Sequence, residues 1–199
     1  MTIELKTSAK KSAPHGSGFQ ETELLTVLAA AFEADPPVRW LYPELSAYQT
    51  HFPDFARAFG GAAFARNTHQ ARDGGAALWI PPGGGPSEGA IEAVIENSIP
   101  AERHSSVFSV FEAMEAFHIE EPHWYLPLMG VVPERQGQGL GSALLRPVLE
   151  LCDADRVPAY LEATTVRSRA LYLRHGFESL GTIDVGGCPA IHPMLRKPK

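Results

Sequence analysis

The sequence reads Gln136-Gly137-Gln138-Gly139-Leu140-Gly141-Ser142 about two thirds of the way along its length. An apolar run, Tyr125 to Val132, precedes this segment, and a run with helical apolar spacing, Leu140 to Leu151, follows it. We therefore predict a strand, a glycine-rich turn and a helix. Glycines let the backbone approach a ligand closely, and a helix start presents unpaired N–H groups and a partial positive charge. The segment thus predicts a phosphate-binding turn.

Length, charge and cysteine content narrow the class of protein. The 199 residues suit a single domain, and a net charge of -6 favours neither nucleic acid nor an anionic membrane as a partner. The two cysteines, Cys152 and Cys188, make no disulfide framework or paired-cysteine zinc site, and we predict no metal. No apolar run is long enough to span a membrane, and residues 1–18 lack the apolar centre of a signal peptide. We expect a cytoplasmic protein.

Hydrophobic periodicity predicts a mixed α/β chain. The expected helices are 21–34, 46–66, 87–99, 102–119, 139–151 and 168–175, and the expected strands are 76–80, 124–132, 159–163, 180–185 and 191–196. Asp35-Pro36-Pro37 should end the first helix, Pro147 should bend the fifth, and Ser168 is the expected N-cap of the last. Residues 1–18 are expected to be a mobile end with at most a short strand near residues 3–6.

Three kinds of phosphate-binding turn compete for the glycine segment. A P-loop needs Lys and then Ser or Thr after its last glycine, whereas this chain has Ser142-Ala143, which excludes it. A dinucleotide-binding turn almost fits the glycine spacing, and Glu162 ends the next strand at a suitable distance for a ribose contact. However, Ser142 takes the position of the third glycine, and Pro133–Gln136 separates the strand from the glycines. The third candidate is a turn that binds the pyrophosphate of an acyl-CoA.

The wider pattern supports the acyl-CoA turn. Residues 129–141, Met129-Gly130-Val131-Val132-Pro133-Glu134-Arg135-Gln136-Gly137-Gln138-Gly139-Leu140-Gly141, resemble the central motif of the GNAT (Gcn5-related) N-acetyltransferase family. That motif is Arg or Gln, two residues, Gly, one residue, then Gly or Ala. Residues 160–164 and 171–177 resemble the following strand and the tyrosine helix of the same family. Segments within 21–82 and the helical segment 87–119 resemble the subgroup that includes puromycin N-acetyltransferase.

The resemblance implies acetyl-CoA as the co-substrate. Backbone N–H groups of the glycine turn would bind the pyrophosphate, and the pantetheine arm would pair with a splayed strand edge. A backbone N–H on that edge would stabilise the tetrahedral oxyanion. Ser168 stands where the family often has an Asn that contacts the CoA arm, and its shorter side chain predicts a weaker contact. The predicted cofactor-binding residues are Met129, Gly130, Val131, Gln136, Gly137, Gln138, Gly139, Leu140, Gly141, Ser142 and Ser168.

The resemblance also assigns catalytic roles. Tyr172 matches the general acid that protonates the departing thiolate. For the general base we name Glu162, at the end of the core strand, with His123 and an ordered chain of waters as alternatives. Cys152 falls on the apolar face of a helix and is not expected to act as a nucleophile.

Together these features predict a GNAT-type fold, with a twisted, mostly antiparallel sheet, a central splayed parallel pair and flanking helices. Within one domain, 1–199, we distinguish a helical insertion, 87–121, and an acetyl-CoA-binding core, 123–177. The expected reaction is acetyl transfer to the amine of a small molecule, with Asp35–Leu41, Ser46–Arg66 and Ser87–Ile119 as substrate walls. The alternatives are a non-catalytic acyl-CoA-binding module, a dinucleotide-binding oxidoreductase and a protein acetyltransferase. A homodimer is compatible with this interpretation.

Overall fold

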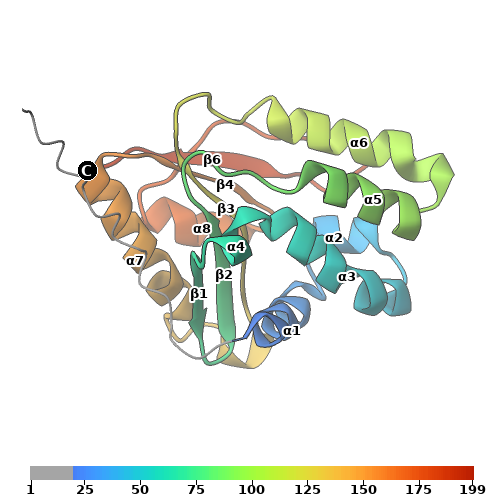
Figure 1. Cartoon of the computed structure of the whole chain (residues 1–199), viewed down its shortest axis with the longest axis horizontal. Helices are drawn as coiled ribbons and strands as arrows, with labels where there is room; N and C mark the ends of the chain where they lie inside the picture. The colour runs from blue at the N-terminus through green and yellow to red at the C-terminus, as the bar shows by residue number, and fades with distance from the viewer. Residues whose placement is uncertain (1–19) are drawn as a thin grey trace, which may run out of the picture.

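A six-stranded sheet runs through the middle of the protein, for which a computed structural model describes residues 20–199 (Figure 1). Its strands are β1 (His69–Arg72), β2 (Gly75–Ile80), β3 (Trp124–Val131), β4 (Ala159–Ala163), β5 (Glu178–Ser179) and β6 (His192–Arg196). The order is β1-β2-β3-β4-β6-β5. Within this part of the chain β3 and β4 are parallel and the other neighbouring strands are antiparallel. The predicted mixed fold is confirmed.

Helices cover both faces of the sheet (Figure 1). One group consists of α1 (Glu21–Phe32), α2 (Pro36–Leu41), α3 (Leu45–Gly60), α4 (Ala62–Ala65), α5 (Glu88–Ser98) and α6 (Ala101–Glu115). The other consists of α7 (Leu140–Asp155) and α8 (Val166–Arg174). Successive residues of a strand point to opposite faces, so Leu78 and Ile80 pack with the first group, and Ala77 and Trp79 pack with the second.

The parallel strands β3 and β4 separate after three paired positions. Trp124–Leu126 pairs with Ala159–Leu161, and β3 then continues to Val131 beside β2 only. The residue after the last pair is Pro127, which has no N–H to donate to a neighbouring strand. The predicted splay is therefore present, and it leaves one edge of β3 open beyond Leu126.

Three expectations for the N-terminal half need correction. Asp35-Pro36-Pro37 ends α1 but also begins α2, because prolines fit the first helical positions and Asp35 Oδ1 accepts a hydrogen bond from Val38 N at 3.2 Å. The helix expected over 46–66 divides at Gly61, whose φ of 40° does not suit an α-helix. Strand β1 was not predicted; it forms a hairpin with β2 around Asp73-Gly74, where Gly74 has a φ of 80°.

Two expectations for the C-terminal third also need correction. The strand expected over 180–185 is reduced to a single bridge between Ile183 and Ile191. Ser168 is not an N-cap, because α8 begins at Val166 and Thr165 caps it by accepting a hydrogen bond from Ser168 N. Pro147 lies inside α7, which continues past it to Asp155.

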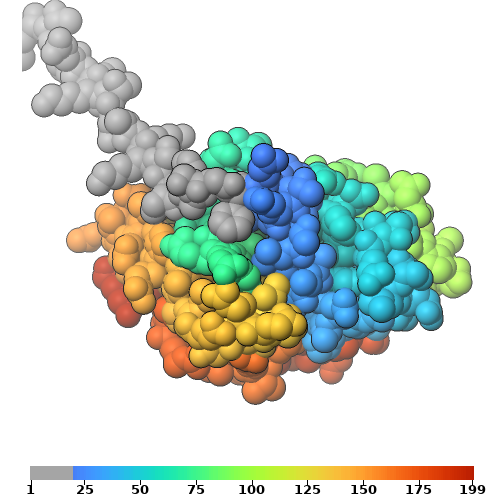
Figure 2. Space-filling model, turned by 90° about the horizontal axis from the view of Figure 1, so that it is seen from below, coloured from blue at the N-terminus to red at the C-terminus, as the bar shows by residue number. Residues whose placement is uncertain are grey.

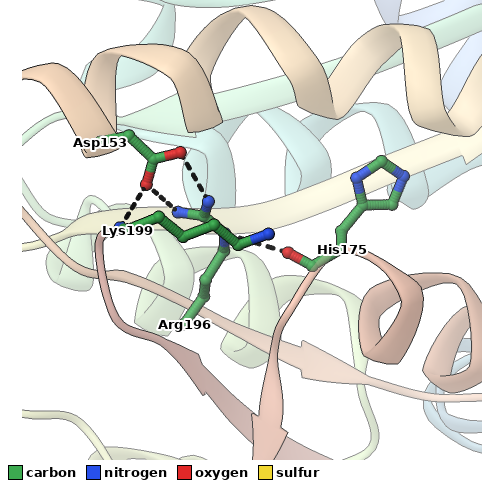
Figure 3. A network of polar contacts seen from close by, with 4 residues as sticks. All are labelled: Asp153, His175, Arg196 and Lys199. Atoms are coloured by element: carbon green, nitrogen blue, oxygen red, sulfur yellow. Dashed lines mark hydrogen bonds and ion pairs between the residues drawn. The ribbon is translucent and has the colours of Figure 1, made fainter.

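A polar network fixes β6 against α7 and the end of α8 (Figure 3). Arg196, at 3% exposure, donates two hydrogen bonds to the Asp153 carboxylate of α7, at 2.8 and 2.7 Å. It also donates to the carbonyl of His175, which follows α8, at 3.0 Å. The backbone N–H of Lys199 donates to the same carboxylate at 2.8 Å. The network therefore ties β6, α7 and the end of α8 together.

The predictions of a mobile end over residues 1–18 and of a short strand near residues 3–6 lie outside the described residues. Across residues 20–199, no helix is both long enough and apolar enough to cross a membrane.

Candidate active site

A cavity of about 570 Å³ lies where β3 and β4 separate. This volume falls within the range of about 300–1,000 Å³ that is common for small-molecule sites. Its walls come from the end of α1, the open edge of β3, the glycine turn, the end of β4 and the face of α8. The cavity is lined by ten of the eleven predicted cofactor-binding residues and by both predicted catalytic residues, namely Met129, Gly130, Val131, Gln136, Gly137, Gly139, Leu140, Gly141, Ser142, Ser168, Tyr172 and Glu162.

The glycine turn owes its shape to left-handed backbone. Gly137 has a φ of 78° and Gly139 a φ of 82°, a region in which side chains with a Cβ are strained. A Cβ built on either residue meets no atom within 4 Å, so both face open space. Helix α7 begins directly afterwards at Leu140, and the free N–H groups of its first turn accompany the positive end of the helix dipole. The arrangement suits an anion.

Side chains around the turn fix it at the mouth of the cavity. Gln136 Nε2 donates to the Val131 carbonyl at 3.0 Å, while its Oε1 accepts from Arg167, a cavity-lining cation. Arg135 forms an ion pair with Asp73, which holds the turn against the β1–β2 hairpin. Figure 2 shows the turn, in yellow, beside the green hairpin. Arg167 supplies a positive charge that the sequence analysis did not assign.

Gln138 is the predicted cofactor residue that does not line the cavity. Its Oε1 accepts a hydrogen bond from Arg135 Nε at 3.1 Å, and its Nε2 donates to the Glu134 carbonyl at 3.2 Å. The side chain thus contributes to the outer surface of the turn.

The open edge of β3 forms another wall of the cavity. Met129, Gly130 and Val131 follow the splay, and their backbone pairs with β2 on the opposite edge. A Cβ on Gly130 would lie 2.4 Å from Ala31 Cβ, so glycine is needed for the end of α1 to pack this closely. The result is a strand edge available to an extended ligand.

Tyr172 lies on α8 with 5% exposure and lines the same cavity. Burial raises the pKa of its phenol above the usual value, and the charges of Asp35 and Glu162 raise the pKa further. A phenol in this position therefore keeps its proton at neutral pH, which a general acid requires.

Ser168 lies one turn before Tyr172 and its hydroxyl is already engaged. Ser168 Oγ donates to the Thr165 carbonyl at 3.0 Å and contacts Thr165 Oγ1 at 2.9 Å. The side chain therefore helps to hold the first turn of α8, although the residue also lines the cavity.

Glu162 joins the cavity to a buried cluster of aromatic rings. Its side chain is 5% exposed, and Oε1 accepts no hydrogen bond from the described residues, with His118 Nε2 at 3.5 Å. The His118 ring lies 4.4 Å from Tyr160 and 5.7 Å from His123 between ring centroids. Burial lowers the pKa of His123, while that of Tyr160 is raised by burial and then by the Glu162 charge. His123 thus lies beyond His118 rather than beside the cavity, whose lining it does not join.

Asp35 begins the expected substrate wall Asp35–Leu41, but sequence reasoning gave its carboxyl no role. It caps α2, yet it is 8% exposed, lines the cavity and accepts a hydrogen bond from Thr164 Oγ1 at the end of β4. Burial raises the pKa of its carboxyl, an effect that the hydrogen bonds from Thr164 and Val38 partly oppose. In the sequence, Asp35 precedes two prolines, a pattern that predicts the end of a helix. His118 was missed for a similar reason, because it falls in an apolar helical run.

The described residues contain no set of side chains that could bind a metal ion. No group of three or more His, Cys, Asp or Glu side chains able to hold an ion occurs within residues 20–199.

Comparison with known proteins adds sequence and fold neighbours. An uncharacterized N-acetyltransferase of Schizosaccharomyces pombe is 34% identical over 58 residues, which cover 29% of this chain and 24% of that relative. A structure described as a histone acetyltransferase HPA2 and related acetyltransferase from Corynebacterium glutamicum has 23% identity and a TM-score of 0.62, with 90% and 91% of the two chains covered. A polyamine N-acetyltransferase of Drosophila melanogaster, which catalyses formation of N-acetylagmatine, has 17% identity and a TM-score of 0.58, with 89% and 94% covered. These two structures show the same fold.

The family assignment comes from a broader match. A model of the acetyltransferase (GNAT) family matches residues 46–177, about two thirds of the 199 residues. The matched region contains the splayed strands, the glycine turn and Tyr172, which are the features that build the cavity. The chain belongs to the GNAT acetyltransferase family.

Proposed function

We propose that the protein transfers an acetyl group from acetyl-CoA to the amine of a small molecule in a ternary complex. The observation that carries this proposal is one cavity that unites an anion-binding turn, an open strand edge, a protonated phenol and a buried carboxylate. These four parts match the four parts of the reaction: the pyrophosphate, the pantetheine arm, the leaving thiolate and the acceptor amine.

Binding of acetyl-CoA follows from the turn and the strand edge. The N–H groups from Gln136 to Ser142 would hold the pyrophosphate, and Arg167 at the mouth would add charge-assisted hydrogen bonds. The pantetheine arm would extend along Met129–Val131 as an added strand. A backbone N–H there would polarise the thioester carbonyl, where it would also stabilise the oxyanion of the tetrahedral intermediate.

The chemistry is direct attack on the thioester. The neutral amine nitrogen forms a bond to the carbonyl carbon, the carbon–sulfur bond breaks, the nitrogen loses one further proton to solvent to become the amide, and the thiolate takes the phenolic proton of Tyr172. The phenolate then regains a proton from solvent. The products are the amide, CoA with a free thiol and one proton released from the acceptor ammonium.

That released proton needs a route from the buried amine. Glu162 is the proposed base, since this buried carboxylate residue lines the cavity and its Oε1 accepts no hydrogen bond from the described residues. His118 Nε2 lies 3.5 Å from this atom and its ring adjoins that of half-buried His123, so the two histidines would pass the proton outward. The earlier alternatives, Glu162 and His123, thereby become successive members of one path.

Further features of the proposal come from the sequence. We retain a cytoplasmic location, the single-domain organisation and the resemblance to the puromycin N-acetyltransferase subgroup as predictions, and a homodimer as a compatible assembly. The match of 24% of the fission yeast relative means that the activity of that whole protein does not transfer to this chain. A non-catalytic acyl-CoA module is the alternative that Ser168 favours, because its hydroxyl is already bound to Thr165.

Two measurements test the proposal. Calorimetry should show binding of acetyl-CoA but not of NAD; tight NAD binding without CoA binding would exclude the transferase. Thiol release should then be assayed with the Tyr172→Phe variant at saturating substrates. We expect turnover to fall by about 10²–10⁴-fold with acetyl-CoA affinity retained. Tyr42→Phe is the matched control, because Tyr42 is also buried but lies outside the cavity, with its OH 3.1 Å from Ser98 Oγ.

Unchanged turnover of Tyr172→Phe would remove Tyr172 as the acid. A wild-type protein that binds acetyl-CoA but acetylates no amine, polyamine or peptide would favour the binding module.

A further inference from the structure

A second, smaller cavity of about 90 Å³ adjoins the first. The two share lining residues at their junction, including Asp35, Pro127 and Glu162. Beyond the junction, the walls are side chains of α2, α3, α6 and the segment before β6, such as Val38, Phe59, Phe111 and Ile191. The predicted substrate walls are therefore represented by α2, α3 and α6, whereas α5 contributes no lining residue.

Two carboxylates stand at the junction, and among the described residues no lysine or arginine forms an ion pair with either of them. Asp35 is bound by the neutral donors Thr164 Oγ1 and Val38 N. Glu162 Oε1 accepts no hydrogen bond from the described residues, and its side chain is 5% exposed. His118 Nε2, at 3.5 Å from Glu162 Oε1, is the basic group nearest to this pair. Two buried carboxylates with so little positive charge beside them favour a ligand that brings positive charge and N–H donors.

The walls beyond the junction are apolar. Among the residues that line the smaller cavity, Asp35 and Glu162 are the ionisable carboxylates, and no lysine, arginine or histidine occurs. The ring centroids of Phe55 and Phe59 lie 5.4 Å apart in a stacked arrangement, and that of Phe111 lies 6.3 Å from that of Phe59 in an edge-on arrangement. The three rings form an aromatic wall. Such a surface gains from burying a hydrocarbon group and offers nothing to a second ammonium.

We infer that the acceptor is a primary amine attached to one compact apolar group, a refinement that rests on the proposed acetyl transfer. The ammonium lies between Asp35 and Glu162, and the apolar group enters the smaller cavity. A protein cavity of about 150 Å³ can hold benzene, so a cavity of 90 Å³ accommodates at most one ring that extends partly into the junction. Simple arylalkyl and short branched alkyl amines fit this description, whereas diamines and two-ring amines do not.

A comparison of acceptor amines with the whole 199-residue chain provides the first test. Thiol release from acetyl-CoA is compared for 2-phenylethylamine, pentane-1,5-diamine and 2-(1-naphthyl)ethylamine. A hydrophobic pocket distinguishes even one methylene by about 10–200-fold, so we expect kcat/KM for 2-phenylethylamine to exceed that for the diamine by about 100-fold or more. A diamine or a peptide acetylated as well as 2-phenylethylamine would overturn the inference while leaving acetyl transfer intact.

Paired substitutions on α6 give the second test. Phe111→Ala enlarges the smaller cavity, whereas Phe108→Ala removes an equally half-buried ring from the same helix without touching the cavity. Phe111→Ala should raise the kcat/KM ratio of the naphthyl amine to 2-phenylethylamine at least tenfold, and Phe108→Ala should leave this ratio unchanged. Equal ratios in the two variants would place the acceptor elsewhere.

A binding measurement separates this inference from the proposed function. Calorimetry of 2-phenylethylamine with the CoA-loaded protein should detect binding that weakens at least tenfold in Asp35→Asn, which keeps the helix cap but not the charge. Failure to bind acetyl-CoA would contradict the proposed function. Acetyl-CoA binding without 2-phenylethylamine binding would contradict the acceptor assignment.

Discussion

Substitution of Gly139 by alanine should separate backbone strain from ligand binding. Gly139 has a φ of 82° and lines the larger cavity, and a Cβ there meets no protein atom within 4 Å. Left-handed backbone costs an alanine roughly 1–2 kcal/mol, so the free energy of unfolding of Gly139→Ala should fall by that amount. For a chain of about 200 residues, the fall corresponds to a Tm lower by about 2–8 °C.

Gly83→Ala is a control with the same backbone requirement. Gly83 has a φ of 72°, and its Cβ position is equally free of neighbours within 4 Å, but it lies in the loop after β2 and outside the cavity. We therefore expect Gly83→Ala to lose as much stability as Gly139→Ala and to bind acetyl-CoA as the wild type does.

Only Gly139→Ala should lose affinity for acetyl-CoA. Its methyl group would occupy space in the turn where a phosphate oxygen accepts a backbone N–H, and one hydrogen bond to a charged group contributes about 1.5–3 kcal/mol. The expected rise in Kd is about 10- to 150-fold, which calorimetry can measure beside urea unfolding curves. If both variants bind acetyl-CoA alike, the glycine turn is not the pyrophosphate site and the assignment of the cavity to CoA loses its main support.

Three further predictions concern the base and the C-terminal network. Glu162→Gln should lower turnover by about 10²–10⁴-fold with unchanged acetyl-CoA affinity. Its turnover should recover in part at higher pH, because the free amine then loses its proton in solution. A Glu162→Gln variant with the wild-type rate at pH 7 would contradict the assignment of Glu162 as the base. Asp153→Asn should lower the free energy of unfolding, measured in urea, by about 3–5 kcal/mol, because it leaves buried Arg196 without its charge partner. Arg196→Met should lower it less, since the Asp153 side chain is 31% exposed and can reach solvent. Equal losses of stability in the two variants would refute this difference. The hydrogen bond from Arg196 lowers the pKa of Asp153. The stability that this ion pair contributes is therefore present above the unfolded pKa of about 3.9 and is lost as pH falls through the folded pKa. The free energies of unfolding of wild type and Arg196→Met should converge below about pH 4, and a difference that stays constant with pH would count against this linkage.

The region from β3 to α8 was predictable because the patterns that indicate its strand, turn and helix are local in the sequence. The glycines of the turn, the apolar strand before it and the tyrosine helix after it lie within about fifty residues, and each shows its own periodicity or backbone requirement. Strand β4 was predicted with its observed bounds, Ala159–Ala163. Errors arose where a local signal had two outcomes: Asp35-Pro36-Pro37 can end a helix or begin one, and Ser168 can occupy an N-cap or the third helical position.

The acceptor side was predictable only as three broad substrate walls, because no single segment contains the side chains that line the smaller cavity. Asp35 meets Thr164 across 129 positions of sequence, and the aromatic wall combines α3 with α6. Each of these side chains is an ordinary helix cap or core residue within its own segment, so the pattern that gives them a joint role exists only after folding. The short hairpin β1–β2 was hidden similarly, since His69–Arg72 carries no apolar run.

The two cavities lie against different sets of helices, and this separation bears on substrate specificity. In the proposed function, the glycine turn and the open edge of β3 would bind the CoA thioester through backbone groups, so they would constrain little about the acceptor. The acceptor would meet side chains of α2, α3 and α6, which pack on the other face of the sheet from α7 and α8. Substitutions in these side chains should therefore leave α7 and α8 undisturbed. Asp35, Glu162 and Pro127 line both cavities, so substitutions there should act on the transfer step, where the acetyl group would meet the amine. Substitutions deeper in the smaller cavity, such as Phe111→Ala, should therefore change which amine is used while the Kd for acetyl-CoA stays constant.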